Sequence, residues 1–397
     1  MSNRPIYLDC HATTPMDERV LEVMLPYFTK HFGNPSSISH AYGWEAEVAV
    51  KLARQCLADA IGATPEEIIF TSGATEANNL ALKGVAEAYF SQGRHIITVE
   101  TEHRAVLDPC RYLQTLGFEV TYLPVQPDGL IDLTQLEQAL RPDTVLVSVM
   151  AANNEIGVLQ PLAAIGAICR QQQILFHTDA AQGIGKIPLD VEEMNIDLMS
   201  LTAHKVYGPK GIGALYVRRR NPRVRLAPQI QGGGQERGIR SGTLSTPQIV
   251  GFAKAVELGL EELKSESQRL LQLRECLWQA LCELEKIHFN GHRTQRLPGN
   301  LNISVEGVDG SALLLGLQST AAVSSGSACS SVNVAPSHVL LALGRPEMLA
   351  YASVRFGIGR FNSAAEIEQV AQQTISTIES LRRSQTIGSK SANFKVR

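Results

Sequence analysis

The sequence predicts an α/β protein with a mostly parallel seven-stranded sheet covered by helices, followed by a smaller α+β domain. First, 397 residues with 44% hydrophobic content can bury a large core in two or three domains. Second, from Glu67 onward short β-branched runs alternate with helical periodicity, which is typical of parallel sheets. Third, an apolar stripe at helical spacing over residues 249–284 indicates two helices, or one kinked helix, that lead into a second domain.

The predicted elements follow in chain order. We expect an extended arm over residues 1–14 that packs with the small domain, a large domain over 15–257, a small domain over 258–382 and a disordered polar tail over 383–397. The large-domain strands are predicted at 68–70, 95–100, 118–125, 144–150, 174–179, 196–202 and 212–217. The small domain is predicted to hold strands at 301–305 and 352–358 and helices at 311–317 and 364–381.

Composition excludes several classes of protein. A formal net charge of -3 gives no general attraction to nucleic acid or to an anionic membrane. The arginines of 218–225 have no interleaved aromatic residues, so we interpret them as a solvated turn. Seven cysteines without a CxxC pair argue against a disulfide framework and a metal site. With no long apolar stretch and no signal peptide, a cytoplasmic location is expected.

Polar residues follow several predicted strands, where ligands bind in such sheets. The turn 72–76, with Ala74 and Thr75, leads into a helix whose N-H groups can hold a phosphate, although an ordinary helix cap is the alternative. His103 follows the strand at 95–100. It is either a structural histidine or a group that stacks on a planar cofactor and transfers protons.

Asp179 ends the strand at 174–179, where a buried carboxylate needs a donor or a cation. A protonated pyridine nitrogen would serve, and capping of the next segment is the alternative. Lys205 lies 26 residues later in a turn between two apolar runs. A buried lysine amine can attack carbonyls such as the aldehyde of pyridoxal phosphate, whereas an isolated lysine of this kind is more often a solvated loop residue.

Together, the motifs FTSGATEANN, TEHRAV, NNEIG, HTDAAQ, LTAHKVYGPKG and RSGT resemble those of class V aminotransferases, and most closely those of the NifS/IscS-type cysteine desulfurases. The matching motifs extend from Tyr7 to Phe361. The resemblance implies a fold-type I, aspartate aminotransferase-like architecture with pyridoxal phosphate as cofactor.

The resemblance also implies roles for individual residues. Lys205 would bond covalently to the cofactor, Asp179 would pair with its ring nitrogen, and His103 would stack on the ring and assist proton transfer. Gln182 would bond the phenolic oxygen, with Asn154 close to it. The phosphate would be held by the following residues: Ala74, Thr75, Thr202, His204 and, from the other subunit of a homodimer, Thr243.

Cys329 lies among small residues at 324–331, a setting for an exposed, reactive thiol, although a buried inert cysteine is commoner. The resemblance implies that Cys329 attacks the sulfur of L-cysteine, becomes a persulfide and passes sulfur to an iron-sulfur scaffold or another acceptor. Arg355, inside an apolar strand, would bind the substrate carboxylate or else pair with an internal acid. Asn34 resembles a second substrate-contacting position.

Two other functions remain open from the sequence. One is a different fold-type I activity, a transaminase or a β-lyase acting on cystine or selenocysteine, in which Cys329 is incidental. The other is a sulfur-carrying or scaffold protein without catalysis. The segment TIGSKSANFKVR shows no likeness to the scaffold-docking motif that ends other members of the family, so the acceptor is left open.

Overall fold

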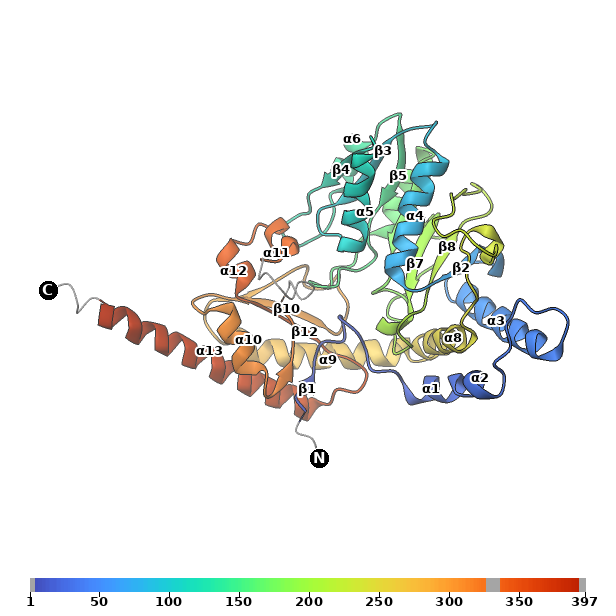
Figure 1. Ribbon diagram of the computed structural model, residues 1–397. Coiled ribbons are helices and arrows are strands. Elements are labelled where there is room, and N and C mark those ends of the chain that lie inside the picture. Colours follow the sequence, from blue (N-terminus) through green and yellow to red (C-terminus); the bar gives the residue numbers. More distant parts are fainter. Residues whose placement is uncertain (1–3, 326–335, 393–397) are drawn as a thin grey trace.

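The computed structural model describes residues 4–325 and 336–392. Figure 1 shows a large sheet with its helices in the upper right of the view and a smaller sheet to the left, joined by the long helices α8 (Thr246–Glu261) and α9 (Leu263–Cys282). Only Glu262 separates these two helices, so the apolar stripe at 249–284 forms two helices rather than one.

The large sheet has seven strands in the order β2-β8-β7-β6-β5-β3-β4. Neighbouring strands are parallel except where β8 pairs antiparallel with β2 and β7. Each strand overlaps one of the seven predicted runs, which confirms the predicted fold class. The bounds are β2 Ile68–Thr71, β3 His95–Val99, β4 Glu119–Leu123, β5 Thr144–Ser148, β6 Leu175–Asp179, β7 Leu198–Thr202 and β8 Gly213–Val217.

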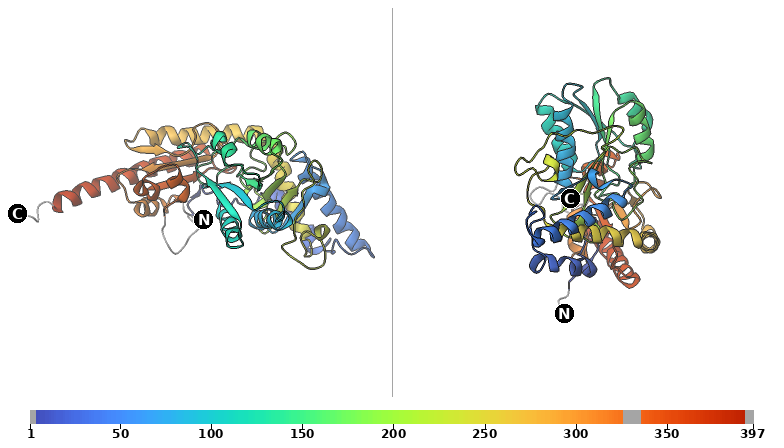
Figure 2. Two further views of the ribbon diagram at one scale, coloured as in Figure 1. Left: turned by 90° about the horizontal axis from the view of Figure 1, so that it is seen from above. Right: turned by 90° about the vertical axis from the view of Figure 1, so that its right-hand side faces the viewer.

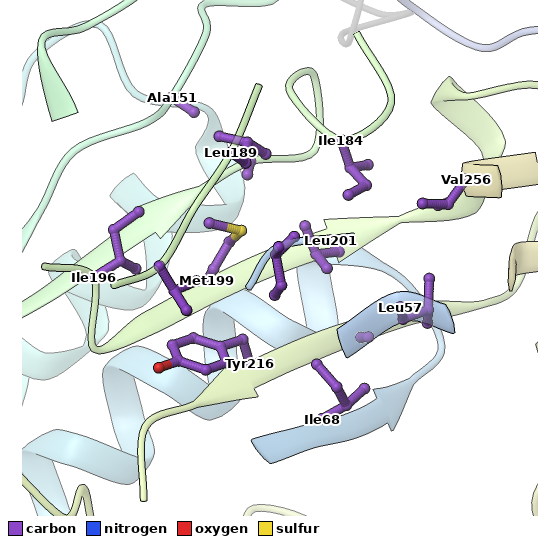
Figure 3. Packing of buried hydrophobic residues seen from close by; sticks show 14 of the residues in the cluster. Leu57, Ile68, Ala151, Ile184, Leu189, Ile196, Met199, Leu201, Tyr216 and Val256 are labelled. Atoms are coloured by element: carbon purple, nitrogen blue, oxygen red, sulfur yellow. The ribbon is translucent and has the colours of Figure 1, made fainter. Parts of the chain in front are cut away.

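Helices cover both faces of this sheet because its strands are apolar on both sides. One face packs against α4 (Ala74–Ala88) and α5 (Arg104–Thr115). The other packs against α1 (Glu18–Met24), α3 (Ala41–Asp59), α7 (Leu162–Gln171) and α8. Figure 3 shows this second core, where Met199, Leu201 and Tyr216 of β7 and β8 lie among aliphatic side chains. The remaining helices of this part are α2 (Pro26–Thr29) and α6 (Leu133–Ala139).

The smaller part contains the antiparallel sheet β12-β10-β9. β10 (Asn300–Val305), β12 (Ser353–Gly357) and α10 (Gly310–Leu317) lie where the sequence predicts them. Three short elements were not predicted, because each is too short to show a periodicity. They are β9 (Ile287–Phe289), α11 (His338–Ala342) and α12 (Glu347–Tyr351).

The amino-terminal arm contacts both parts of the molecule. β1 (Ile6–Tyr7) pairs in parallel with β11 (Ala321–Ala322) of the smaller part. Further along the arm, Thr14 is hydrogen-bonded to the large part. Its N-H and its Oγ1 both donate to the carbonyl oxygen of His204, and its Oγ1 accepts a hydrogen bond from the N-H of Tyr207.

The tail expected to be disordered over 383–397 is helical as far as Ala392, and residues 393–397 lie outside the described residues. The last helix, α13, spans Ala364–Ala392 instead of ending at Leu381, and it projects beyond the rest of the molecule (Figures 1 and 2). The segment after Arg382 has no proline to stop the helix, and its polar composition suits a solvated helix end as well as a coil. In the described part of the chain, no helix combines the length and hydrophobicity needed to cross a bilayer.

Candidate active site

A cavity of about 780 Å³ lies at the carboxyl ends of the parallel strands, between the two parts of the molecule. This is the position expected for a ligand site in such a sheet. Its lining includes most of the residues selected from the sequence: Ala74, Thr75, His103, Asn154, Asp179, Gln182, Thr202, His204, Lys205 and Arg355.

One wall of the cavity is the start of α4, which forms an anion cradle. β2 leads through Gly73, whose φ of 152° is accessible to glycine, into a first turn that no side chain caps. The N-H groups of such a turn lack intrahelical acceptors, and the helix dipole favours an anion there. Thr202 and His204 line the same cavity. Burial and Lys205 lower the pKa of His204 to about 4, so it is neutral at pH 7.

His103 caps the start of α5. Its Nδ1 accepts from the N-H of Ala105 at 3.1 Å, so Nε2 carries the hydrogen of the neutral ring. Burial is the main reason that its pKa falls below the usual value, and the charge of Lys205 lowers it further. The ring is therefore a neutral imidazole beside the cavity with one nitrogen left for a ligand.

Asp179, at the end of β6, accepts two hydrogen bonds from neutral donors. Asn78 Nδ2 donates to Oδ2 at 2.6 Å, and the N-H of Ala181 donates to Oδ1 at 2.9 Å. The second bond is the capping contact left open by the sequence. Asp179 also lines the cavity, where its carboxylate would suit a cationic ring nitrogen. Asn78 was missed, although it belongs to FTSGATEANN.

Gln182 is oriented by the amino-terminal arm. Its Nε2 donates to the carbonyl oxygen of His11 at 2.8 Å. His11 also lines the cavity, and its Nε2 is buried without a hydrogen-bond partner. An unsatisfied buried polar atom beside a cavity is what a ligand would pair with. His11 was not selected from the sequence, where the only signal was a histidine among turn-forming polar residues.

Arg355 forms the internal ion pair that the sequence left open as an alternative, and it also lines the cavity. Its Nη2 pairs with Asp9 Oδ1 at 2.6 Å, and Nη1 donates to the carbonyl oxygen of Asn154. Its Nε is buried without a partner. The internal ion pair therefore exists, while one donor remains for a carboxylate in the cavity.

Three further residues of the cavity were not selected as site residues from the sequence. Glu155 is buried, and burial raises its pKa to about 7 although it accepts a hydrogen bond from Ser337 Oγ. Ser337 and His338 form the start of α11. The motif NNEIG contained Glu155, but nothing in the sequence indicated that the other two would reach the cavity.

Three predicted site residues are not placed in the cavity. Asn34 is exposed, and its Oδ1 accepts from the N-H of Ser36, so this segment forms a local turn. Thr243 is exposed and does not line the cavity of its own chain. Cys329 lies outside the described residues.

The residues present fit a phosphorylated pyridine aldehyde. The anion cradle of α4 suits a phosphate, the carboxylate of Asp179 suits a protonated ring nitrogen, and Lys205 supplies an amine for the aldehyde. Fold and site together define a pyridoxal-phosphate-dependent enzyme of fold type I.

Comparison with known proteins narrows this class. The model of the family described as Aminotransferase class-V matches residues 6–370. A mitochondrial cysteine desulfurase of Arthroderma benhamiae is 56% identical over 96% of this chain and 76% of its own length. Cysteine desulfurase IscS of Aeromonas hydrophila is 56% identical over 95% of this chain and 94% of its own. A solved structure, "SspA in complex with cysteine", is 40% identical with a TM-score of 0.78, covering 90% of this chain and all of that one.

The chain therefore belongs to the class-V aminotransferase family, and within it to the NifS/IscS-type cysteine desulfurases. Enzymes of this family depend on pyridoxal phosphate.

Proposed function

We propose that this enzyme removes sulfur from L-cysteine, giving L-alanine and a persulfide on Cys329. The observation that carries the proposal is one cavity that combines Lys205, Asp179 and His103 with both flanks of the segment containing Cys329. On one flank, Ser324 forms a backbone bridge with Arg355. On the other, Pro336 and Ser337 line the cavity.

L-Cysteine is the substrate that this site and its relatives favour. The Nε of Arg355 offers a charged donor to an α-carboxylate. The relative SspA was solved with cysteine. The cavity, of about 780 Å³, also has room for a cofactor together with an amino acid as small as cysteine.

The residues of the chain would share the work as follows. Ala74, Thr75, Thr202 and His204 would hold the phosphate, Gln182 and Asn154 the phenolic oxygen, and Lys205 Nζ the aldehyde carbon. Bound there, pyridoxal phosphate supplies an electron sink for the bonds at the substrate's α-carbon. Asp179 keeps that sink effective by holding a proton at the ring nitrogen.

Proton transfer falls to two residues. Lys205 Nζ would take the α-proton of the substrate. His103 would offer Nε2 for a further transfer, because its Nδ1 is already engaged by Ala105. The lowered pKa of His103 leaves its ring neutral at pH 7, which suits it to exchange a proton.

Cys329 receives the sulfur. Its thiolate attacks the substrate sulfur, and a new S-S bond forms as the bond between that sulfur and the substrate carbon breaks. The bonding electrons return to the carbon, which is protonated, so that alanine leaves. The overall change is cysteine and a thiol to alanine and a persulfide.

The first prediction tests this chemistry. Changing Cys329 to Ala should preserve the visible absorbance of the bound cofactor while abolishing sulfide and alanine formation from cysteine, because only the sulfur acceptor is lost. Cys276→Ala is the matched control, since Cys276 is exposed on α9. Lys205→Ala should change the absorbance itself by removing the covalent attachment.

Product analysis separates the alternatives. Pyruvate in place of alanine would identify a β-lyase, and full turnover by the Cys329→Ala enzyme would exclude the persulfide. A purified protein without bound cofactor or turnover would support a carrier or scaffold role.

We further propose that the enzyme works as a homodimer in which Thr243 reaches the phosphate of the other subunit. Support comes from large apolar side chains exposed on α1 to α3 and their connections: Leu25, Phe28, Phe32, Ile38, Tyr42, Trp44, Val48 and Leu52. These helices lie together at the end of the molecule opposite α13 (Figure 1). Large apolar side chains exposed in one region of a protein are typical of a protein interface.

The destination of the sulfur and the compartment are also proposals. An iron-sulfur scaffold or another acceptor protein would take the persulfide sulfur in the cytoplasm, as the composition predicts. The curated relatives include both a mitochondrial and a bacterial enzyme. A sulfur-label transfer assay with purified candidate acceptors would identify the acceptor.

A further inference from the structure

Lys186 has no role in the chemistry described above, yet it lies directly behind the site. It follows Gln182 by four residues in the segment after β6, and its Nζ donates to Gln182 Oε1 at 3.3 Å. On its other side is a small cavity of about 30 Å³, which is lined by Cys10, Tyr207 and Glu266 among others. An amine in so enclosed a place is costly to bury unless it is hydrogen-bonded or paired.

The first effect of Lys186 is on the amide of Gln182. A backbone carbonyl can only accept, so the contact with the oxygen of His11 must come from Gln182 Nε2. An ammonium can only donate, so the atom facing Lys186 must be Oε1. Both contacts select the same orientation of the amide. The second hydrogen of Nε2 is then left for the cavity, which Gln182 lines.

The second effect is electrostatic. Burial, followed by the charge of Lys205, lowers the pKa of Lys186 to about 8, while Cys10 and Glu266 act in the opposite direction. Burial raises the pKa of Cys10 to about 12 and lowers that of His11, and it raises that of Tyr207, so these neighbours are uncharged at pH 7. The charged groups here are Lys186, Lys205 and Glu266 of α9.

We propose that Lys186 is a positioning residue for the cofactor: it holds Gln182 with an N-H donor toward the phenolic oxygen, and its ammonium opposes a second positive charge at the nitrogen of Lys205. The inference rests on the proposed function, because it requires pyridoxal phosphate at Lys205. Its consequence is that the cofactor's protonation equilibrium is set partly by a residue that does not touch the cofactor.

The test is a pH titration of the visible absorbance of the purified holoenzyme without substrate. Lys186→Met removes both the donor and the charge. The midpoint should move to higher pH by about one unit, a tenfold change in proton affinity, because a nearby cation no longer opposes protonation. Lys186→Arg keeps the charge and a donor, so its midpoint should return toward that of the wild type. Lys51→Met, at an exposed position on α3, controls for the loss of a lysine.

The outcomes separate this inference from the proposed function. A Lys186→Met midpoint equal to that of the wild type and of Lys51→Met, in a coloured enzyme that still makes alanine, overturns the role of Lys186 alone. A shift that Lys186→Arg fails to reverse also overturns it, because a purely structural defect would behave in that way. If Lys186→Met does not retain cofactor, Lys186→Gln keeps a donor without the charge and should show the same upward shift. A wild-type protein without cofactor absorbance contradicts the proposed function itself.

Discussion

Arg355 carries two contacts that a single substitution cannot separate. Its Nη2 serves the ion pair with Asp9, whereas its Nε is buried without a partner in a residue that lines the cavity. If the substrate carboxylate binds here, loss of the guanidinium fork must weaken cysteine binding beyond any effect of the ion pair.

The second prediction uses that difference. Arg355→Lys should lower kcat/KM for cysteine by about 10- to 100-fold, mostly through KM, since a hydrogen bond between charged groups contributes about 1.5 to 3 kcal/mol. Asp9→Asn removes only the ion pair and should lower the thermal midpoint with a smaller change in KM. Steady-state kinetics and a melting curve distinguish them. A wild-type KM in Arg355→Lys would assign the arginine to structure alone.

At the scale of residues, the structure brings together in one cavity several residues that the sequence singled out, and their roles stay predictions. Asp179 and His103 were selected because a polar residue follows a buried strand, and Lys205 was selected from its turn. His11 and Ser337 were missed because they reach the cavity through pairings between distant segments, which leave no local pattern. The dual role of Arg355 was foreseen only as two alternatives.

At the scale of elements, the carboxyl half of the large sheet is held together by a buried histidine. His177 of β6 bonds Ser148 of β5 through Nδ1 at 2.8 Å and Ser200 of β7 through Nε2 at 3.0 Å. Burial lowers its pKa to about 4. The strand that positions Asp179 is therefore hydrogen-bonded to both neighbouring strands through an imidazole ring that is neutral in the folded protein.

The third prediction follows from that pKa. Between pH 6.5 and 4, the unfolded chain binds a proton at His177 that the folded protein does not, so stability falls as the pH falls. The advantage of the wild type over His177→Asn in free energy of unfolding should shrink by about 2 kcal/mol from pH 7 to pH 5. Urea titrations at the two values measure it. An unchanged difference would mean that the ring titrates normally.

Strands were predicted more reliably than the ends of helices. Each strand of the large sheet is apolar and bounded by turn residues, so its position is visible in the sequence. The end of α13 was misjudged, because a solvated helix and a disordered tail have the same polar composition. The short elements β9, α11 and α12 depend on tertiary packing.

At the scale of the whole molecule, the exposed apolar side chains on α1 to α3 are the main unexplained surface. Phe32 is 63% exposed and Ile38 84% exposed, and both lie in the connection between α2 and α3. Such exposure is costly for an isolated subunit.

The fourth prediction concerns this surface. The double change Phe32→Asp and Ile38→Asp should convert a dimer into a monomer in light scattering, and cofactor should be retained less tightly because Thr243 no longer reaches the partner's phosphate. Met348→Asp is the control, since Met348 is equally exposed on α12 at a different place. A monomeric wild type, or a double variant with unchanged mass and cofactor content, contradicts the proposed dimer.

The amino-terminal arm also sets an order of assembly. Asp9 bonds Arg355 across 346 residues of sequence, and β1 pairs with β11, so the arm needs partners that are made after the whole large sheet. Contacts of such long range form late, after the loop between them has closed. The large sheet can fold while synthesis continues, but the wall of the cavity that contains Arg355 is complete only after β12 has been made. An incomplete chain would thus have a folded sheet without a finished active site.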